Sequence, residues 1–174
     1  YDTTTNALIT GGVLDGIQGN DDVSLRGTIG QFEDKNAGVN KTVVVDHVDL
    51  SGAQRNNYIV DYNGSSTTGT IEKAELTVSG VHPLDRVYDG TTNASFTGTP
   101  VLSGIFAADD GKVSAPIENV SGHFVDRNAG VDKEVAVFLS GGELAGEEAH
   151  NYVLVGVDGA GKIATITPAP LRVN

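Results

Sequence analysis

Pairs of adjacent carboxylates occur at two points where the sequence also indicates a turn. One pair ends the segment GNDD and the other lies within ADDG. Hard cations prefer oxygen ligands, so both pairs are candidate calcium sites. When Val23–Ser24 is aligned with Val113–Ser114, however, the pairs lie two positions apart, and no EF-hand loop is present. Solvated turn acids are the simpler interpretation, with calcium as the alternative. The four candidates are Asp21, Asp22, Asp109 and Asp110.

Catalytic chemistry has little support in the sequence. A hydrolase needs a nucleophile and a base, and histidine is the usual base. None of the four histidines recurs at the equivalent place in the other half of the chain. No His-x-x-His, His-Glu-x-x-His, Gly-x-Ser-x-Gly or phosphate-loop motif occurs. We therefore expect that the chain is not an enzyme.

A covalent crosslink is a further hypothesis, because two lysines and two asparagines recur. An amide bond between Lys41 and Asn57, and another between Lys133 and Asn151, would take the place of disulfides. Each bond would lower the intact mass by about 17 Da.

The composition places these residues in an acidic protein of strands and turns. Glycine supplies 23 of the 174 residues, and cysteine, methionine and tryptophan are absent. The net charge of −12 is shared evenly, with 11 acids and 5 bases up to Gly80 and 12 acids and 6 bases after it. An acidic surface without a basic stripe repels phosphate groups, so we expect neither nucleic-acid binding nor attachment to anionic lipid. No apolar run is long enough to span a membrane, so we expect no membrane insertion.

The elements that position these residues occur twice. Tyr1–Asp2 matches Tyr88–Asp89, and FEDKNAGVNK matches FVDRNAGVDK. Asn57–Tyr58 matches Asn151–Tyr152, and TIEKAELTV matches TITPAPLRV. The offset grows from 87 to 95 residues between these blocks, as expected when loops absorb insertions and paired strands keep their register. The chain is therefore predicted to contain two copies of one unit of about 80 to 90 residues.

Alternating apolar residues predict strands in each copy. KTVVVDHVDL is rich in β-branched residues, and VSLRGTIGQF, NYIVDY and GTIEKAELTV supply further strands in the first copy. VSAPIENVSGHF, NYVLVGV and ATITPAPLRV are their counterparts, and clusters of Gly, Asn and Asp between them indicate turns. We predict an all-β protein of two tandem Ig-like β-sandwich repeats, elongated end to end, with a β-grasp-like repeat as the alternative.

The recurring Tyr-Asp element has a structural interpretation. The ring of Tyr1 or Tyr88 would cover one end of the core, and Asp2 or Asp89 would accept hydrogen bonds from nearby backbone N–H groups. Gly90 permits a positive φ. Thr3 occupies the glycine position in the first copy, which suggests that the backbone requirement is not absolute.

Two other recurring elements are predicted to fix loops. The DKNAGV and DRNAGV segments indicate tight connections, in which asparagine and glycine would adopt left-handed geometry; these residues are Asn36, Gly38, Asn128 and Gly130. Tyr58 and Tyr152 each begin a strand after a polar loop. Their rings could reach back to the loop backbone, as in a tyrosine corner.

The boundary between the copies is predicted at residues 79 and 80. The first repeat would span residues 1–79 and the second residues 80–174. The strand at Glu75–Gly80 follows the last matched strand of the first copy but could also open the second. In that second case the first copy lacks an opening strand of its own.

Together these blocks resemble the YDG-type (MBG-related) tandem repeats of large bacterial surface adhesins. The matching segments are YDGTT at Tyr88–Thr92, FVDRNAGVDK, LAGEEAHNYVL and TITPAPLRV. The resemblance implies an exported protein of the filamentous-haemagglutinin or two-partner-secretion type, located outside the cell or on the bacterial surface. Such repeats form a non-catalytic stalk that displays a binding region in adhesion or biofilm formation. The resemblance carries over no catalytic residue.

Two other functions remain open at this point. A lectin-like module would commonly stack sugars on exposed aromatic rings, and Tyr62 is the one tyrosine outside the repeated positions. A calcium-stabilised adhesive module would use the acidic pairs. The expected partners are neighbouring repeats of the same chain, with host or matrix glycans or other adhesin molecules as alternatives, and we expect the chain to be a monomer.

Overall fold

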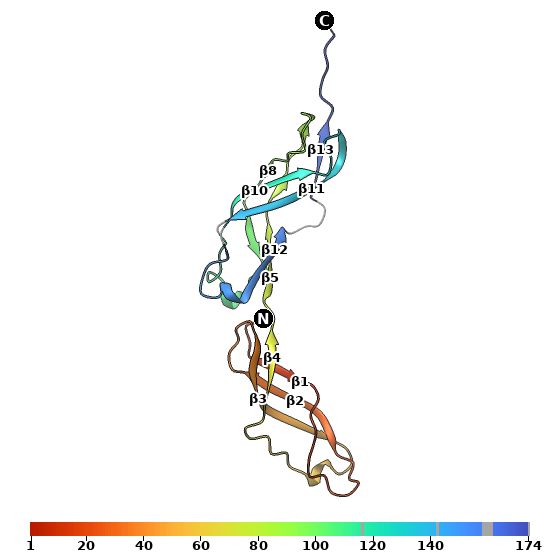
Figure 1. Cartoon of the computed structure of the whole chain (residues 1–174), viewed down its shortest axis with the longest axis vertical. Coiled ribbons are helices and arrows are strands. Elements are labelled where there is room, and N and C mark those ends of the chain that lie inside the picture. The colour runs from red at the N-terminus through yellow and green to blue at the C-terminus, as the bar shows by residue number, and fades with distance from the viewer. Residues whose placement is uncertain (116, 142, 158–161, 174) are drawn as a thin grey trace. The chain divides into compact units, whose positions relative to one another are not determined.

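The structure of the chain is a computed structural model that describes residues 1–115, 117–141, 143–157 and 162–173. Within these residues the chain is built from β-strands and three short 3₁₀ turns (Figure 1). The turns are η1 (Arg55–Asn57), η2 (Ala107–Asp109) and η3 (Ala149–Asn151). The prediction of an all-β protein is confirmed. The chain divides into two compact units, Tyr1–Lys73 and Ala74–Asn174.

The first unit is one antiparallel sheet with the strand order β1–β2–β3–β4. These strands are β1 (Asn6–Ile9), β2 (Ser24–Phe32), β3 (Gly38–Ser51) and β4 (Ser66–Ile71). β2 and β3 form a long hairpin whose register runs from Phe32 opposite Val43 to Ser24 opposite Ser51. Side chains alternate across β3, so Val43 is buried while Val44 is half exposed.

The second unit repeats this hairpin and adds a second sheet. Its strands are β5 (Ala74–Ser79), β6 (His82–Pro83), β7 (Arg86–Val87), β8 (Phe96–Thr97), β9 (Val101–Ser103), β10 (Ile117–Phe124), β11 (Gly130–Gly141), β12 (Tyr152–Val157) and β13 (Ile163–Thr167). One sheet has the order β10–β11–β13–β7 and another has the order β12–β5–β9, while β6 and β8 form a pair. β13 lies beside β11 as β4 lies beside β3.

β5 is the most deeply buried strand of the second unit. It pairs in parallel with β12 and antiparallel with β9 (Figure 1). Leu76 and Val78 are 0% exposed. Fully burying side chains of this size contributes roughly 1.5–3 kcal/mol each. β5 therefore contributes two fully buried side chains to the sheet β12–β5–β9.

The two units differ in how much apolar surface they bury. In the first unit the buried apolar side chains are Val23 and Val43. The second unit buries a larger set around the Phe124 cluster and along β5: Leu76, Val78, Val81, Val113, Phe124, Val135, Tyr152, Ala164 and Ile166. Tyr88 packs against the Phe124 cluster, which agrees with the predicted covering role of that ring.

Two of the predicted strands are wrong. NYIVDY forms no strand beyond η1, although its counterpart in the second unit is β12. The second half of ATITPAPLRV, residues 168–173, also forms no strand, although its counterpart is β5. A strand needs a neighbour that satisfies its backbone groups, and β12 and β5 serve each other in this way. The strand at Glu75–Gly80, which the sequence left open to either copy, lies in the second unit as β5, because β5 pairs with strands of that unit.

The proposed lysine–asparagine crosslink is not supported by the strand register. Lys41 lies where β3 begins, and Asn57 lies in η1, beyond the other end of β3. Strand β3 therefore separates them, since each strand residue advances about 3.3 Å. Lys133 and Asn151 are separated in the same way by β11.

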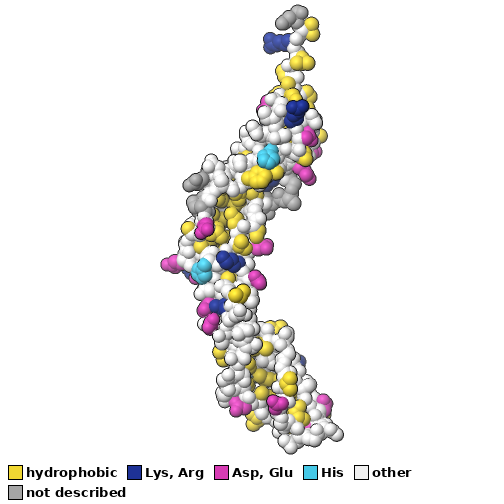
Figure 2. Space-filling model, viewed as in Figure 1, with side chains coloured by type: hydrophobic (Ala, Val, Ile, Leu, Met, Phe, Trp, Pro, Cys, Tyr) yellow, Lys and Arg dark blue, Asp and Glu magenta, His cyan; other side chains and the backbone are white. Residues whose placement is uncertain are grey.

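Charged side chains are spread over the surface. On the face shown in Figure 2, acidic side chains occur singly or in small groups. None of the helices in the described part of the chain is long and apolar enough to cross a membrane.

Candidate functional site

The Tyr-Asp element forms the same hydrogen-bonded turn in both units. Asp2 Oδ1 accepts hydrogen bonds from the backbone N–H and the hydroxyl of Thr4, both at 2.9 Å. Asp89 Oδ1 accepts the corresponding two bonds from Thr91, also at 2.9 Å. The predicted role of the aspartates as acceptors is therefore confirmed. These bonds lower the pKa of Asp2 below its usual value.

The residue between the aspartate and the threonines is left-handed in both units. Gly90 has φ 84° and Thr3 has φ 70°. The suggestion that the first copy relaxes this requirement is wrong, because Thr3 adopts the same geometry without being glycine. A β-branched residue at positive φ is strained.

In the second unit, Asp89 also lies beside the cationic side chain of Arg86. Arg86 forms an ion pair with Asp89 and donates to the carbonyl of Thr91 at 2.5 Å. Its guanidinium also lies 5.2 Å from the centre of the Phe124 ring. The Thr91 hydrogen bonds, followed by the Arg86 contact, lower the pKa of Asp89 to about 2. The turn is therefore tied to the core cluster of the second unit.

A lysine–aspartate pair closes the NAGV connection in both units. Lys41 Nζ lies 2.7 Å from Asp34, and Lys133 Nζ lies 2.7 Å from Asp126. Each aspartate also accepts a hydrogen bond from the backbone N–H two residues later, at Asn36 or Asn128. The lysine contact is the main reason that the pKa values of both aspartates are lowered.

The predicted left-handed residues in this connection were misplaced. Asn36, Gly38, Asn128 and Gly130 do not have a positive φ; the residues that do are Asn40, with φ 54°, and Asp132, with φ 50°. Both lie in the bulge at the start of the long strand. The glycines instead leave room for the lysine stem. A Cβ on Gly38 would meet Lys41 Cδ at 3.3 Å, and one on Gly130 would meet Lys133 Cδ at 3.4 Å.

The repeated tyrosines hold a remote loop in each unit. The hydroxyl of Tyr58 donates to Asp21 at 2.7 Å and accepts from the N–H of Gln18 at 2.9 Å. The Asp21 contact raises the pKa of Tyr58, so its phenol stays protonated at neutral pH. The hydroxyl of Tyr152 donates to Asp109 at 2.8 Å and accepts from the N–H of Phe106 at 3.2 Å.

This arrangement corrects the alignment of the acidic pairs. Asp21 and Asp109 occupy the same place, because each receives the tyrosine hydroxyl. Asp22 corresponds to Lys112, as the Val-Ser alignment also has it, since their carbonyls accept from the N–H groups of Gln54 and Glu148. The alignment of Val23–Ser24 with Val113–Ser114 did not show that Asp21 matches Asp109, because the second unit carries two extra residues after Asp109.

The candidate calcium ligands do not converge. Asp22 accepts a hydrogen bond from the N–H of Ala53 at 3.0 Å, and Asp110 is exposed at the end of η2. Within the part of the chain that the structure describes, no three His, Cys, Asp or Glu side chains are grouped as a metal site would require.

Two pairs of recurring glycines were missed in the sequence. A Cβ on Gly52 would lie 2.0 Å from the Asp22 carbonyl oxygen, and one on Gly146 would lie 2.1 Å from that of Lys112. Gly30 and Gly122 similarly face the carbonyls of Val44 and Ala136 in the long hairpins. Their recurrence was visible in the sequence. Only the structure shows the backbone that each one approaches.

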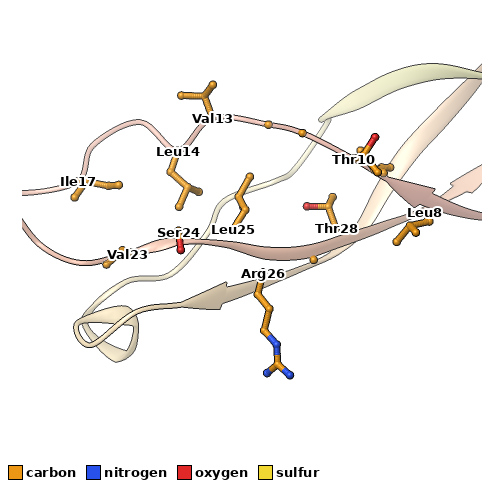
Figure 3. Close-up of a pocket in the computed structure, with 14 residues that line it drawn as sticks. Leu8, Thr10, Val13, Leu14, Ile17, Val23, Ser24, Leu25, Arg26 and Thr28 are labelled. Carbon is orange, nitrogen blue, oxygen red and sulfur yellow. The ribbon is translucent and has the colours of Figure 1, made fainter.

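An open apolar groove runs through the first unit. One part, of about 380 Å³, lies between the segments 13–17 and 58–61, with Val23 and Leu50 also lining it. A larger hollow of about 710 Å³ follows β2 (Figure 3). In Figure 3, Leu14 and Leu25 point toward one another across the hollow, and Arg26 points away. Tyr62, the tyrosine considered for sugar binding, is half-buried at the edge of this region.

The second unit fills the equivalent space with β5. Segment 13–15 corresponds to β9 and segment 58–63 to β12, and both of those strands pair with β5. Consequently Tyr152 is 2% exposed and Asn151 is 0% exposed, whereas Tyr58 is half-buried and Asn57 is exposed.

A recurring glycine marks the same difference between the two units. Gly104 and Gly16 both have positive φ. A Cβ on Gly104 would lie 2.8 Å from the carbonyl oxygen of Glu75 in β5, but one on Gly16 would meet nothing within 4 Å. Within residues 1–73, therefore, no strand lies against Gly16 as β5 lies against Gly104.

These features define a cysteine-free, all-β chain in which repeated carboxylate hydrogen bonds brace the loops. The chain belongs to the YDG domain family, whose model matches residues 1–69 and 72–160. No curated protein and no solved structure matches it.

Proposed function

We propose that the chain is a non-catalytic pair of tandem β-sandwich repeats from the stalk of a bacterial surface adhesin. It would act outside the cell by spacing and displaying a binding region in adhesion or biofilm formation. The observation that carries this proposal is that the recurring polar side chains form hydrogen bonds within the protein. In both units the aspartates of the Tyr-Asp turn and of the NAGV connection accept hydrogen bonds from their own unit, and a third aspartate accepts from the tyrosine hydroxyl of the Asn-Tyr element.

A structural role accounts for what the two units share. The Tyr-Asp hydrogen bonds lie within one turn, and the others join a loop to a strand or to another loop of the same unit. Repeat proteins depend on units that each fold around their own core and contact only their neighbours. Membership of the YDG family and the resemblance to adhesin repeats support this interpretation.

A glycan array tests the proposal against its two alternatives. The labelled chain is applied in buffer with calcium and again with chelator, and its melting temperature is measured in both. We expect no saturable glycan binding and no change in melting temperature. Calcium-independent binding would favour a lectin. A melting temperature that falls on chelation would favour a calcium-stabilised module, because a ligand that binds only the folded state stabilises it.

A further inference from the structure

We propose that Asn63 is a site of spontaneous modification, at which the side-chain amide is lost as ammonia and a carboxylate takes its place. The reaction produces a mixture of aspartate and isoaspartate at this position. Water is the only other reactant, so no enzyme is required. This inference goes beyond the proposed function and does not depend on it.

Asn63 is the one asparagine of the chain that is followed by glycine. Asparagine is a thermally labile residue, because the backbone nitrogen of the next residue can attack its side-chain carbonyl carbon. A side chain on that next residue hinders the attack. Glycine has no such side chain and gives the backbone its widest conformational freedom. Gly64 therefore makes Asn63 the most reactive asparagine in the sequence.

The structure leaves both reacting groups open to solvent. Asn63 and Gly64 are exposed and form a turn, in which Gly64 has φ 75°. Among the described residues, no hydrogen bond engages the side chain of Asn63 or the N–H of Gly64. A Cβ placed on Gly64 would meet no described atom within 4 Å. The side chain of Asn63 therefore has room to fold back over the peptide bond that follows it.

The turn is held by backbone groups that the reaction does not use. The N–H of Ser65 donates to the carbonyl of Tyr62 at 3.0 Å. Asp61 Oδ1 accepts from the N–H of Asn63 at 3.1 Å, and the carbonyl of Ser65 accepts from the N–H of Val45 at 3.0 Å. These hydrogen bonds place the reactive pair in a short connection before β4 rather than within a paired strand.

The reaction has two steps. In the first, hydroxide removes the proton of the Gly64 N–H, the nitrogen forms a bond to Cγ of Asn63, and the bond from Cγ to the side-chain nitrogen breaks with release of ammonia. The product is a five-membered cyclic imide. In the second step, water opens the ring. Breaking the new bond between the nitrogen and Cγ gives aspartate, whereas breaking the original peptide bond gives isoaspartate.

The second copy carries an aspartate at the equivalent place in its sequence. When TIEKAELTV is aligned with TITPAPLRV, Asn63–Gly64 falls opposite Asp158–Gly159. We therefore expect the aspartate product to be compatible with the fold of the first unit. The isoaspartate product should disturb it, because it adds a carbon to the main chain between Tyr62 and Ser65, which are joined by a hydrogen bond.

Two other asparagines serve as internal controls in the same molecule. Asn119 is exposed, but it is followed by Val120 within β10, whose residues pair with β11. Asn151 is 0% exposed, and its Nδ2 donates to Glu148 at 2.8 Å. Neither combines an open side chain with a following glycine, so both should keep their amides.

Incubation of the full chain at mildly alkaline pH tests the proposal, with a sample kept in mild acid as the reference. Mass spectrometry with fragmentation that distinguishes aspartate from isoaspartate follows each asparagine. We expect both products at Asn63, while Asn119 and Asn151 are unchanged. The rate at Asn63 should lie within about tenfold of the rate in a free peptide of residues 59–68, because an exposed turn opens at little cost in free energy.

Variants at the turn test the mechanism. Gly64→Ala should slow the reaction several-fold or more, because the added methyl group hinders attack by the backbone nitrogen. Asn63→Gln should abolish the products at this position, because glutamine would have to form a larger ring. Ser66→Ala is the matched control, since it changes a neighbouring exposed side chain and leaves the reactive pair intact. It should react as the wild type does.

Three outcomes would overturn the proposal. A folded chain that keeps Asn63 while the free peptide is converted would show that the turn blocks the reaction. Equal conversion at Asn63 and Asn119 would show that the following glycine and the open turn have no role. An unchanged rate in Gly64→Ala would exclude attack by the backbone nitrogen. None of these outcomes bears on the stalk function.

Discussion

At the scale of single residues, carboxylates determine the loops of both units. Asp2 and Asp89 hold the Tyr-Asp turn, Asp34 and Asp126 hold the NAGV connection, and Asp21 and Asp109 receive the tyrosine hydroxyls. Short aspartate side chains can accept bonds from backbone groups that a turn would otherwise leave unpaired. Much of the acidity that suggested cation binding is therefore engaged within the protein.

The left-handed position of the Tyr-Asp turn gives a matched pair of variants. Thr3→Gly should stabilise the first unit by up to about 1 kcal/mol, because a threonine at positive φ is strained by roughly 1–2 kcal/mol and the added chain entropy offsets part of that gain. Gly90→Thr should destabilise the second unit by a similar amount, since no atom lies near the added Cβ and the cost is conformational. Denaturant unfolding measures both. The changes in the free energy of unfolding should have opposite signs for the two variants, and changes of the same sign would contradict this explanation.

The tyrosine hydroxyls are expected to contribute unequally. Tyr152→Phe removes a buried hydrogen bond to a carboxylate and should cost about 1.5–3 kcal/mol. Tyr58→Phe removes the same bond at a half-buried site and should cost about 1 kcal/mol or less. Urea unfolding of the two variants compares them directly. Equal losses of unfolding free energy in the two variants would contradict the view that burial beside β5 strengthens the Tyr152 hydrogen bond.

The lowered pKa of Asp89 predicts that the stability of the second unit falls in acid. Its folded pKa is about 2, below the ordinary value of 3.8, so its contribution is fully present above pH 4 and is lost as the pH falls toward 2. Asp89→Asn keeps an acceptor for Thr91 but removes the charge. The stability difference between wild type and variant should therefore shrink on acidification over this range. A constant difference from pH 5 to pH 2 would show that the charge has no role.

At the scale of elements, β5 decides how complete each unit is. The same Asn-Tyr segment is a strand in the second unit and an irregular, half-exposed segment in the first. The sequences are nearly equivalent, so the difference lies in the neighbour. Strand formation depends on a partner for the backbone as much as on local propensity.

Leu76 and Leu171 test this dependence on context. Leu76→Ala should cost about 2–5 kcal/mol, because it opens a cavity at a fully buried position. Leu171→Ala occupies the equivalent place in sequence but is 95% exposed, and should leave the stability of the dilute chain unchanged. Thermal and denaturant unfolding of the two variants at low concentration measure this contrast. A large cost at Leu171 would mean that the segment 168–173 is buried within its own chain.

At the scale of the whole molecule, the two units should differ in stability. Hydrophobic burial is the main favourable contribution to folding, and the first unit buries little apolar surface compared with the second. Limited proteolysis and hydrogen exchange should therefore find the first unit opening more readily. Filling its groove with an added strand, as β5 fills the second unit, should raise its protection toward that of the second unit.

The sequence by itself determined the all-β class, the recurring sequence blocks, the YDG family and the acceptor role of the Tyr-Asp carboxylates. These follow from local patterns of residues that recur at fixed places. Only the tertiary structure decided that Asp21 matches Asp109, that Thr3 is left-handed, and that NYIVDY and residues 168–173 are not strands. The physical reason is that pairing and burial join residues far apart in the chain. Similar local sequences therefore take different states according to the strands that pair with them.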